Sequence, residues 1–272
     1  MGIWKEIYGR RNLIRELVAK DLKVRYLRPA LGFSWAFLSP LFIVAIFYLV
    51  FSVILRVETK EAPFILYLMS GVFTWRFFQD SLMSSVSSLI DNKNLIRECN
   101  FAHYLIPVSI VLANAINFLP SLAILIIAAL IILKGLPLFV ILLPVIFAIH
   151  VGLAIGISII SSVIYVRWRD VKYLLEAALL ILFYLTPSFY SVYLVKDSFS
   201  VPWFRLYIYN PFVGILGLYR LATLKGFYSI AKESTGLLSL AVSPLIFTLA
   251  ILIFGFYFYN QHKHSINDYL AY

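Results

Sequence analysis

Six long apolar stretches fill most of this 272-residue chain, and no segment between them is large enough to form a soluble catalytic domain. A helix needs about 20 mainly apolar residues to cross the hydrocarbon core of a bilayer, and each stretch reaches that length. The sequence therefore predicts an all-α integral membrane protein that forms a single transmembrane domain of six spans. The predicted spans are residues 32–55, 63–90, 104–133, 136–166, 173–195 and 237–259.

The composition supports this class. Hydrophobic residues make up 62% of the chain and charged residues 13%, whereas soluble globular domains carry about 25% charged residues. The single cysteine, Cys99, excludes an intrachain disulfide. Residues 1–31 are too rich in charge for a cleaved signal peptide, so we expect the first span to be retained.

The net charge of +10 follows the predicted topology and does not form a stripe for nucleic acid, so no nucleic-acid partner is expected. Lysine and arginine concentrate before the first span and in the connections that follow the second and fourth spans. Such an excess in short segments marks the cytoplasmic face. Both termini are therefore predicted to be cytoplasmic.

Residues 1–31 carry apolar side chains at helical spacing, including Ile7, Ile14 and Val18, with basic residues on the opposite face. This pattern predicts an amphipathic helix that lies in the membrane interface with its cations near anionic lipid. Pro29 is expected to end it. The alternative is a positively charged anchor with no further task.

Several short motifs occur in a characteristic order along residues 20–222. They are RYLRPALGFSWAFLSP at 25–40, Gly71 and Trp75, NLIRECNFAHYLIP at 94–107, Arg169-Asp170, LTPSFY at 185–190 and NPFVGILGLYR at 210–220. Together they resemble the permease (transmembrane) subunits of type-2 class ABC exporters, in the branch that exports O-antigen and teichoic-acid polysaccharides. The chain departs from the family where Ala102 and His103 follow Phe101, because the family often has a proline there.

The chain has no G-x-x-x-x-G-K-[ST] motif to hold nucleotide phosphates, so it binds no cofactor of its own in this interpretation. ATP and magnesium are expected in a separate ATPase subunit. The resemblance implies that a short cytoplasmic helix after the second span docks on that subunit, and the alternative is an ordinary polar turn. The predicted coupling residues are Asn94, Leu95, Ile96, Arg97 and Phe101, with Arg169 and Asp170 as a second, smaller contact.

Residues 196–236 form a long connection that is only partly polar. Asn210 followed by Pro211 predicts a helix N-cap with proline in the first turn, opening a helix that ends near Ala222. This helix spans roughly half a bilayer, so we expect it to re-enter the membrane at the outer mouth of a conduit. The alternative is an amphipathic helix resting on the outer leaflet.

Aromatic residues make up 17% of the chain, and some fall deep within spans. An aromatic wall holds the apolar faces of sugar rings weakly at many points, which suits a polymer conduit, although aromatics also face lipid or fill helix interfaces. The predicted conduit-lining residues are Phe33, Phe37, Tyr48, Tyr184 and Tyr190.

Arg76 lies near the middle of the second span, where a charge is costly. It is predicted either to pair with Asp80, four residues on, or to meet the pyrophosphate of a lipid-linked substrate. His150 lies near Gly152 and Gly156, whose spacing predicts close helix packing.

The sequence thus predicts the transmembrane subunit of an ABC exporter for a lipid-linked polysaccharide on an undecaprenyl-type carrier, in the bacterial inner membrane. A second copy of the chain, two ATPase subunits and membrane lipid are the expected partners. Alternative cargoes are teichoic acid, a glycolipid or a drug. A secondary transporter is disfavoured because the spans hold almost no acidic residues, and a glycosyltransferase because no D-x-D motif occurs.

Overall fold

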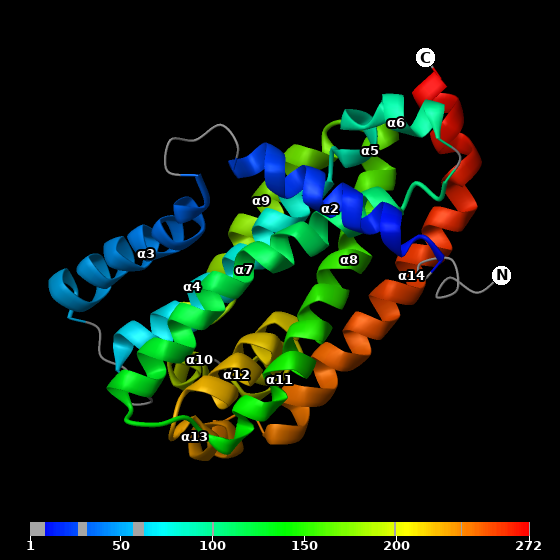
Figure 1. Ribbon diagram of the computed structural model, residues 1–272. Coiled ribbons are helices and arrows are strands. Elements are labelled where there is room, and N and C mark those ends of the chain that lie inside the picture. Colours follow the sequence, from blue (N-terminus) through cyan, green and yellow to red (C-terminus); the bar gives the residue numbers. More distant parts are fainter. Residues whose placement is uncertain are drawn as a thin grey trace.

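The computed structural model describes residues 9–26, 32–56, 63–99, 101–198, 200–234 and 236–271, and every regular element in these ranges is helical (Figure 1). The predicted all-helical class is confirmed. Four helical segments are long and apolar enough to cross a membrane, and they match the predicted first, third, fourth and sixth spans. They are Trp35–Ile54, Leu105–Ile132, Leu138–Arg167 and Leu237–Lys263.

The first of these segments begins with the 3-10 turn η1 (Gly32–Ser34), continues as α3 (Trp35–Tyr48) and ends in the π-helical turn η2 (Leu49–Ile54). The other three correspond to α7 (Leu105–Ile132), the 3-10 turn η3 (Leu138–Leu142) with α8 (Leu143–Arg167), and α14 (Leu237–Ala271).

The predicted second span is shorter in the structure. Helix α4 (Phe64–Ser85) is 22 residues long but less apolar than the four segments above, because it carries Arg76, Gln79 and Asp80. It ends at Ser85, and the short helix α5 (Ser88–Asp91) follows where the prediction continued the span to residue 90. α4 lies at the centre of the bundle and packs against α3, α7, α8, α9 and α12.

The predicted fifth span, residues 173–195, is wrong as one continuous helix. Helix α9 (Val171–Leu185) stops before Thr186, which is extended (φ −102°, ψ 140°), and a turn leads into α10 (Val192–Ser198). The cause is Pro187, because a proline disfavours helical geometry in the residue before it. α9 is therefore only 15 residues long.

Helices α8 and α14 pack closely through glycines, as the spacing of Gly152 and Gly156 predicted. A Cβ atom added at Gly156 would lie 2.6 Å from a side-chain carbon of Ile251, and one added at Gly255 would lie 2.9 Å from the carbonyl oxygen of Gly156. Small residues here allow the two backbones to approach. His150, also on α8, is 1% exposed and packs among Phe77, Phe78 and Tyr219.

One end of the bundle gathers α2 (Arg11–Tyr26), α5, α6 (Lys93–Glu98) and the last turns of α14 (Figure 1). The amphipathic character of α2 is confirmed, because Ile14 and Leu17 are buried; residues 1–8 and 27–31 of the predicted helix lie outside the described ranges. α14 is 35 residues long, so it continues through most of the tail predicted for residues 260–272. Ile266 packs there in a hydrophobic cluster with Ile14 and Ile96.

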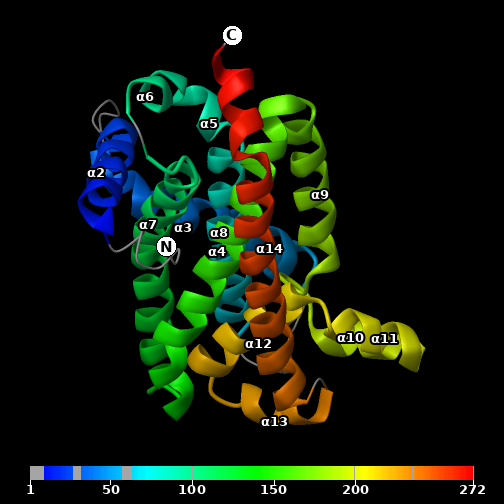
Figure 2. The same cartoon turned by 90° about the vertical axis from the view of Figure 1, so that its right-hand side faces the viewer.

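The opposite end holds α10, α11 (Val201–Ile208), α12 (Pro211–Thr223) and α13 (Phe227–Ser234), with α10 and α11 projecting sideways from the bundle (Figure 2). The helix predicted to open at Asn210 is confirmed. The side chain of Asn210 caps α12 by accepting a hydrogen bond from the Phe212 amide at 3.0 Å. Every residue of α12 from Phe212 to Thr223 is buried.

Candidate functional site

A groove of about 390 Å³ lies between α3 and α9, with α4 as its floor. Its walls are mainly apolar and aromatic, whereas its floor carries an amide and two charges. The lining residues are Ile43 and Phe47 of α3; Val72, Trp75, Arg76, Gln79 and Asp80 of α4; and Leu180, Phe183 and Tyr184 of α9. The groove therefore presents an apolar and aromatic surface beside a polar and charged one.

Four phenylalanine rings join the walls of this groove, where the first predicted span meets the fifth. Phe47 lies 6.2 Å from Phe183 between ring centroids, and Phe51 lies 5.1 Å from Phe189. Phe183 and Phe189 are themselves 5.6 Å apart. Ring contacts of this kind contribute about 0.5–1.5 kcal/mol each beyond burial, so they hold α3 and η2 against α9 and the turn that follows it.

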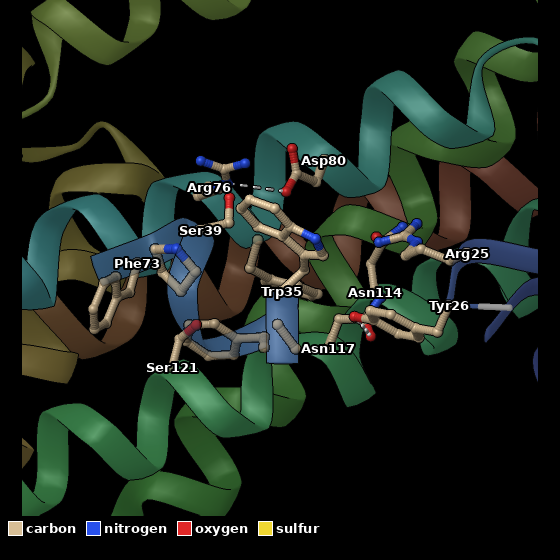
Figure 3. A pocket seen from close by; sticks show the side chains of 14 residues that line it. Arg25, Tyr26, Trp35, Ser39, Phe73, Arg76, Asp80, Asn114, Asn117 and Ser121 are labelled. Carbon is tan, nitrogen blue, oxygen red and sulfur yellow. Dashed lines mark hydrogen bonds and ion pairs between the residues drawn. The ribbon is translucent and has the colours of Figure 1, made fainter. Parts of the chain in front are cut away.

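A second hollow of about 230 Å³ lies beside the groove, between α2, α3, α4 and α7 (Figure 3). Its lining combines charged, amide and hydroxyl groups with apolar and aromatic side chains. The lining residues are Arg25, Tyr26, Trp35, Ala36, Ser39, Pro40, Phe73, Arg76, Phe77, Asp80, Asn114, Asn117, Phe118 and Ser121.

Arg76 and Asp80 lie beneath α3 and are shared by both hollows. The Nε atom of Arg76 is 3.4 Å from Oδ2 of Asp80, which confirms the predicted pairing within α4, and the two side chains are 35% and 49% exposed. Charged groups at membrane depth face water or a bundle interior. These exposed fractions place the pair on the surface of both hollows.

Two asparagines of α7 complete the second hollow. Asn117 Oδ1 accepts a hydrogen bond from the Tyr26 hydroxyl at 2.7 Å, and Asn114 Nδ2 donates to Ser84 Oγ at 2.8 Å. The remaining amide atoms, Asn114 Oδ1 and Asn117 Nδ2, are buried and have no hydrogen-bond partner in the part of the chain that the structure describes. Buried polar atoms in proteins are nearly always paired, so this wall is suited to polar contents.

The predicted conduit residues occupy different environments. Tyr184 lines the groove and is 58% exposed, whereas Phe37 and Tyr48 are exposed on α3 but do not line either hollow. Tyr190 is partly buried, and its hydroxyl donates to the Tyr184 carbonyl at 3.0 Å. The side chain of Phe33 lies outside what the structure describes.

Helix α6 divides the predicted coupling residues into two groups. Asn94 and Arg97 are exposed, and Leu95 is partly buried. Ile96 and Phe101, by contrast, are 8% and 6% exposed and pack into the bundle. The prediction that Ile96 and Phe101 present an apolar surface to a partner is therefore corrected, because the apolar face of this segment is already covered by α2, α7 and α14.

The segment around α6 is tied to both ends of the chain. The His103 amide donates to the Tyr259 hydroxyl on α14 at 2.9 Å, and Tyr104 packs against the Tyr259 ring at 5.2 Å. On the other side, Lys20 Nζ of α2 donates to Asn92 Oδ1 at 2.9 Å. A force applied to α6 would therefore reach α2 and α14 directly.

The connection between α8 and α9 lies at the same end as α6 (Figure 2). Arg169 and Asp170 are both exposed there, and the Arg169 guanidinium lies 5.4 Å from the centroid of the Tyr165 ring. Both exposed segments therefore lie at the same end of the bundle.

Sequence reasoning assigned no role to Arg220, which lies within the long connection of residues 196–236. It is 1% exposed, and its guanidinium carbon lies 3.5 Å from the centroid of the Tyr67 ring. Its nitrogens donate to Tyr67 Oη at 2.7 Å, to the Pro187 carbonyl at 2.6 Å and to the Ser188 carbonyl at 3.2 Å. The NPF…R motif of α12 was visible in the sequence, but the partners of Arg220 lie on α4 and in the turn between α9 and α10.

Across the described residues, no group of three or more His, Cys, Asp or Glu side chains is placed to hold a metal ion. The polar groups of both hollows are instead arginine, amide and hydroxyl donors beside a single carboxylate. This set favours binding and guiding a ligand.

The apolar helices, the groove and the exposed basic end together define a multi-pass integral membrane protein. Residues 12–224 match the family model described as "ABC-2 type transporter". The chain belongs to the ABC-2 type transporter family, which confirms the resemblance seen in its motifs.

Three curated relatives share the printed name "O-antigen export system permease protein RfbA". One from Klebsiella pneumoniae is 31% identical over 207 residues, covering 75% of this chain and 77% of the relative. A second from that organism is 28% identical over 268 residues, covering 95% of each chain. One from Myxococcus xanthus is 27% identical over 216 residues, covering 79% of this chain and 82% of the relative.

Proposed function

We propose that this chain is the transmembrane subunit of an ATP-driven ABC transporter that exports a lipid-linked polysaccharide, O-antigen or a similar polymer, across the bacterial inner membrane. The observation that carries the proposal is the groove between α3 and α9, with aromatic walls and a charged floor, in a chain whose relatives are named O-antigen export permeases. A teichoic-acid, glycolipid or drug exporter of the same family is the second candidate.

The proposed topology has six spans, with α4 and α9 as the second and fifth. Both termini are cytoplasmic in this arrangement, because α2, α6, the connection from α8 to α9 and the end of α14 share one end of the bundle. Together they carry most of the exposed arginine and lysine residues in the described part of the chain. Helices α10–α13, which include most of the segment 196–236 and begin at Val192, then lie on the outer side as short re-entrant or interfacial helices. The buried surface of α12 supports a position inside the protein for that helix.

The polymer path is proposed to form between two copies of the chain. Helix α3 and the turn η2 expose large apolar side chains such as Phe42, Ile46 and Val53, which a second copy or lipid must cover. Two grooves facing each other would enclose one path, with Tyr184 and Tyr190 from the fifth span and Phe37 and Tyr48 from the first near its walls. Arg76 and Asp80 would form the charged floor of this path.

Two ATPase subunits are proposed to bind and hydrolyse ATP with magnesium, while this chain itself is not an enzyme. Their docking surface would be the exposed face of α6, with Asn94 and Arg97, and the second contact would be Arg169 and Asp170. Ile96 would act inside the bundle and pass the movement of α6 to α2 and α14.

The cargo is tested by deleting the gene and complementing it with this chain. We expect the surface polysaccharide to disappear on deletion, lipid-linked polymer to accumulate on the cytoplasmic side, and both effects to be reversed by the wild-type chain. The surface glycan that is lost distinguishes O-antigen from teichoic acid. Normal surface glycan and no accumulation after deletion would contradict the proposal.

The docking surface is tested by replacing Arg97 with Glu and Asn94 with Trp. We expect the partner ATPase to co-purify poorly with the double variant, because both side chains are exposed on α6. Arg205→Glu is the matched control, since Arg205 is an exposed arginine at the opposite end of the bundle. Equal loss of the ATPase in the control would refute the assigned surface.

A further inference from the structure

We propose that the hollow between α2, α3, α4 and α7 binds the headgroup of an anionic phospholipid, with Arg25 and Arg76 contacting its phosphate. Figure 3 shows this hollow, which adjoins the groove and shares Arg76 and Asp80 of α4 with it. The inference concerns a lipid that stays with the protein, so it does not depend on which cargo is exported.

The charges of the hollow favour an anion. Its lining holds two arginines and a single carboxylate, Asp80, and both Arg25 and Arg76 interact electrostatically with that carboxylate. One positive charge is therefore left over, which a phosphate diester would balance. Basic pockets between membrane helices on the cytoplasmic side bind anionic headgroups for this reason.

The uncharged groups of the hollow favour a headgroup with free hydroxyls. Ser39 of α3 and Ser121 of α7 line the same space as Asn117, and Asp80 offers an acceptor beside them. A glycerol headgroup has hydroxyls that both donate and accept hydrogen bonds, so it matches this mixture. Phosphatidylglycerol combines these hydroxyls with the single negative charge.

The size and depth of the hollow agree with a headgroup. Its volume of about 230 Å³ is below the range of about 300–1,000 Å³ typical of larger ligands, so it is too small for a stretch of polymer. Trp35 lines its wall and is 42% exposed, which is typical of an aromatic ring at the headgroup level. Arg25 is the last residue but one of α2, at the end of the bundle proposed to be cytoplasmic.

The test is native mass spectrometry of the full-length purified chain titrated with phosphatidylglycerol, with phosphatidylcholine as the reference lipid. Arg25→Gln is expected to weaken phosphatidylglycerol binding about tenfold, because one charge-assisted hydrogen bond is lost. Lys23→Gln is the matched control, since Lys23 is an exposed cation of the same helix that does not line the hollow, and it should leave binding within about twofold.

A second pair of variants tests the free volume of the hollow without changing its charges. Ser39→Leu fills the hollow and keeps every charge, so it should abolish the preference for phosphatidylglycerol, whereas Ser39→Ala leaves the hollow open and should retain it. Equal weakening by Lys23→Gln and Arg25→Gln would overturn the proposal, because it would indicate unspecific attraction to anionic lipid. Equal affinity for phosphatidylcholine would overturn it as well.

Competition with two other phosphate compounds tests whether the hollow recognises a phospholipid, a free phosphate ion or the carrier lipid. Neither inorganic phosphate nor undecaprenyl phosphate should displace phosphatidylglycerol at equimolar concentration. Displacement by inorganic phosphate would reduce the site to an unspecific anion site, and displacement by undecaprenyl phosphate would assign it to the carrier of the cargo. Either result would overturn the assignment to a phospholipid, and neither bears on whether the chain exports a polysaccharide.

Discussion

Replacing Arg220 with methionine is expected to loosen the break between α9 and α10 from the rest of the bundle. The Arg220 guanidinium donates to the carbonyl oxygens of Pro187 and Ser188, and these have no other donor in the part of the chain that the structure describes. Methionine fills similar space but donates no hydrogen bond. The variant therefore buries two carbonyl groups without partners.

The size of the effect follows from these two carbonyls. Each unsatisfied buried carbonyl costs about 1–3 kcal/mol. Tyr67 and Ser70 keep other hydrogen bonds, to the carbonyls of Tyr190 and Tyr67 respectively, so they add little. Removing a buried charge recovers part of the cost, which leaves a net loss of about 2–4 kcal/mol in the free energy of unfolding.

The assay is denaturant unfolding in mixed micelles, combined with hydrogen exchange of residues 186–198. Arg205→Met is the control, because Arg205 is an exposed arginine on α11, and it should change the free energy of unfolding by no more than about 0.5 kcal/mol. Hydrogen exchange should accelerate around residues 186–198 only in the Arg220 variant. Equal stability of the two variants would refute the role assigned to Arg220.

Three further predictions concern single positions. Gly71→Ala should destabilise the fold by about 1–3 kcal/mol, measured by the same unfolding assay, because its Cβ would collide with the Ser188 backbone; wild-type stability would contradict this. Asn210→Ala should cost about 1 kcal/mol and accelerate hydrogen exchange of the Phe212 amide, which it no longer caps. Burial lowers the pKa of His103 from 6.5 in the folded protein. As the pH drops below about 6.5, the unfolded state therefore takes up the proton before the folded state does. The free energy of unfolding then falls by at most about 1.4 kcal/mol per pH unit. The free energy of unfolding should be measured at pH 7.5 and pH 5.5, and its difference between the two pH values should be smaller in His103→Gln than in the wild type. The same difference in both proteins would count against this role of His103.

The features that the sequence predicted correctly depend on neighbours along the chain. The Arg76–Asp80 pair lies within one helix, and the Asn210 cap acts two residues away, so their spacing alone determines the contact. The packing of Gly156 against α14 was also predicted, because small residues at this spacing allow close approach wherever the partner helix lies.

The features that were missed depend on contacts between distant segments. Arg220 meets Ser70 and Ser188, which are 150 and 32 residues away, so nothing in its local sequence distinguishes it from an exposed loop arginine. Ile96 is apolar on a short surface helix, and only the tertiary packing of α14 and α2 decides that it faces inward. The end of α9 at Leu185 was different, because Pro187 stood in the sequence as a local cause.

The central claim is that this chain forms the membrane path and a separate ATPase supplies the energy. The most direct measurement reconstitutes the chain in vesicles with and without its ATPase and follows the transfer of a lipid-linked polysaccharide to the opposite leaflet. The account predicts transfer only when both proteins, ATP and magnesium are present. Transfer at the full rate by the chain alone, without nucleotide, would contradict it.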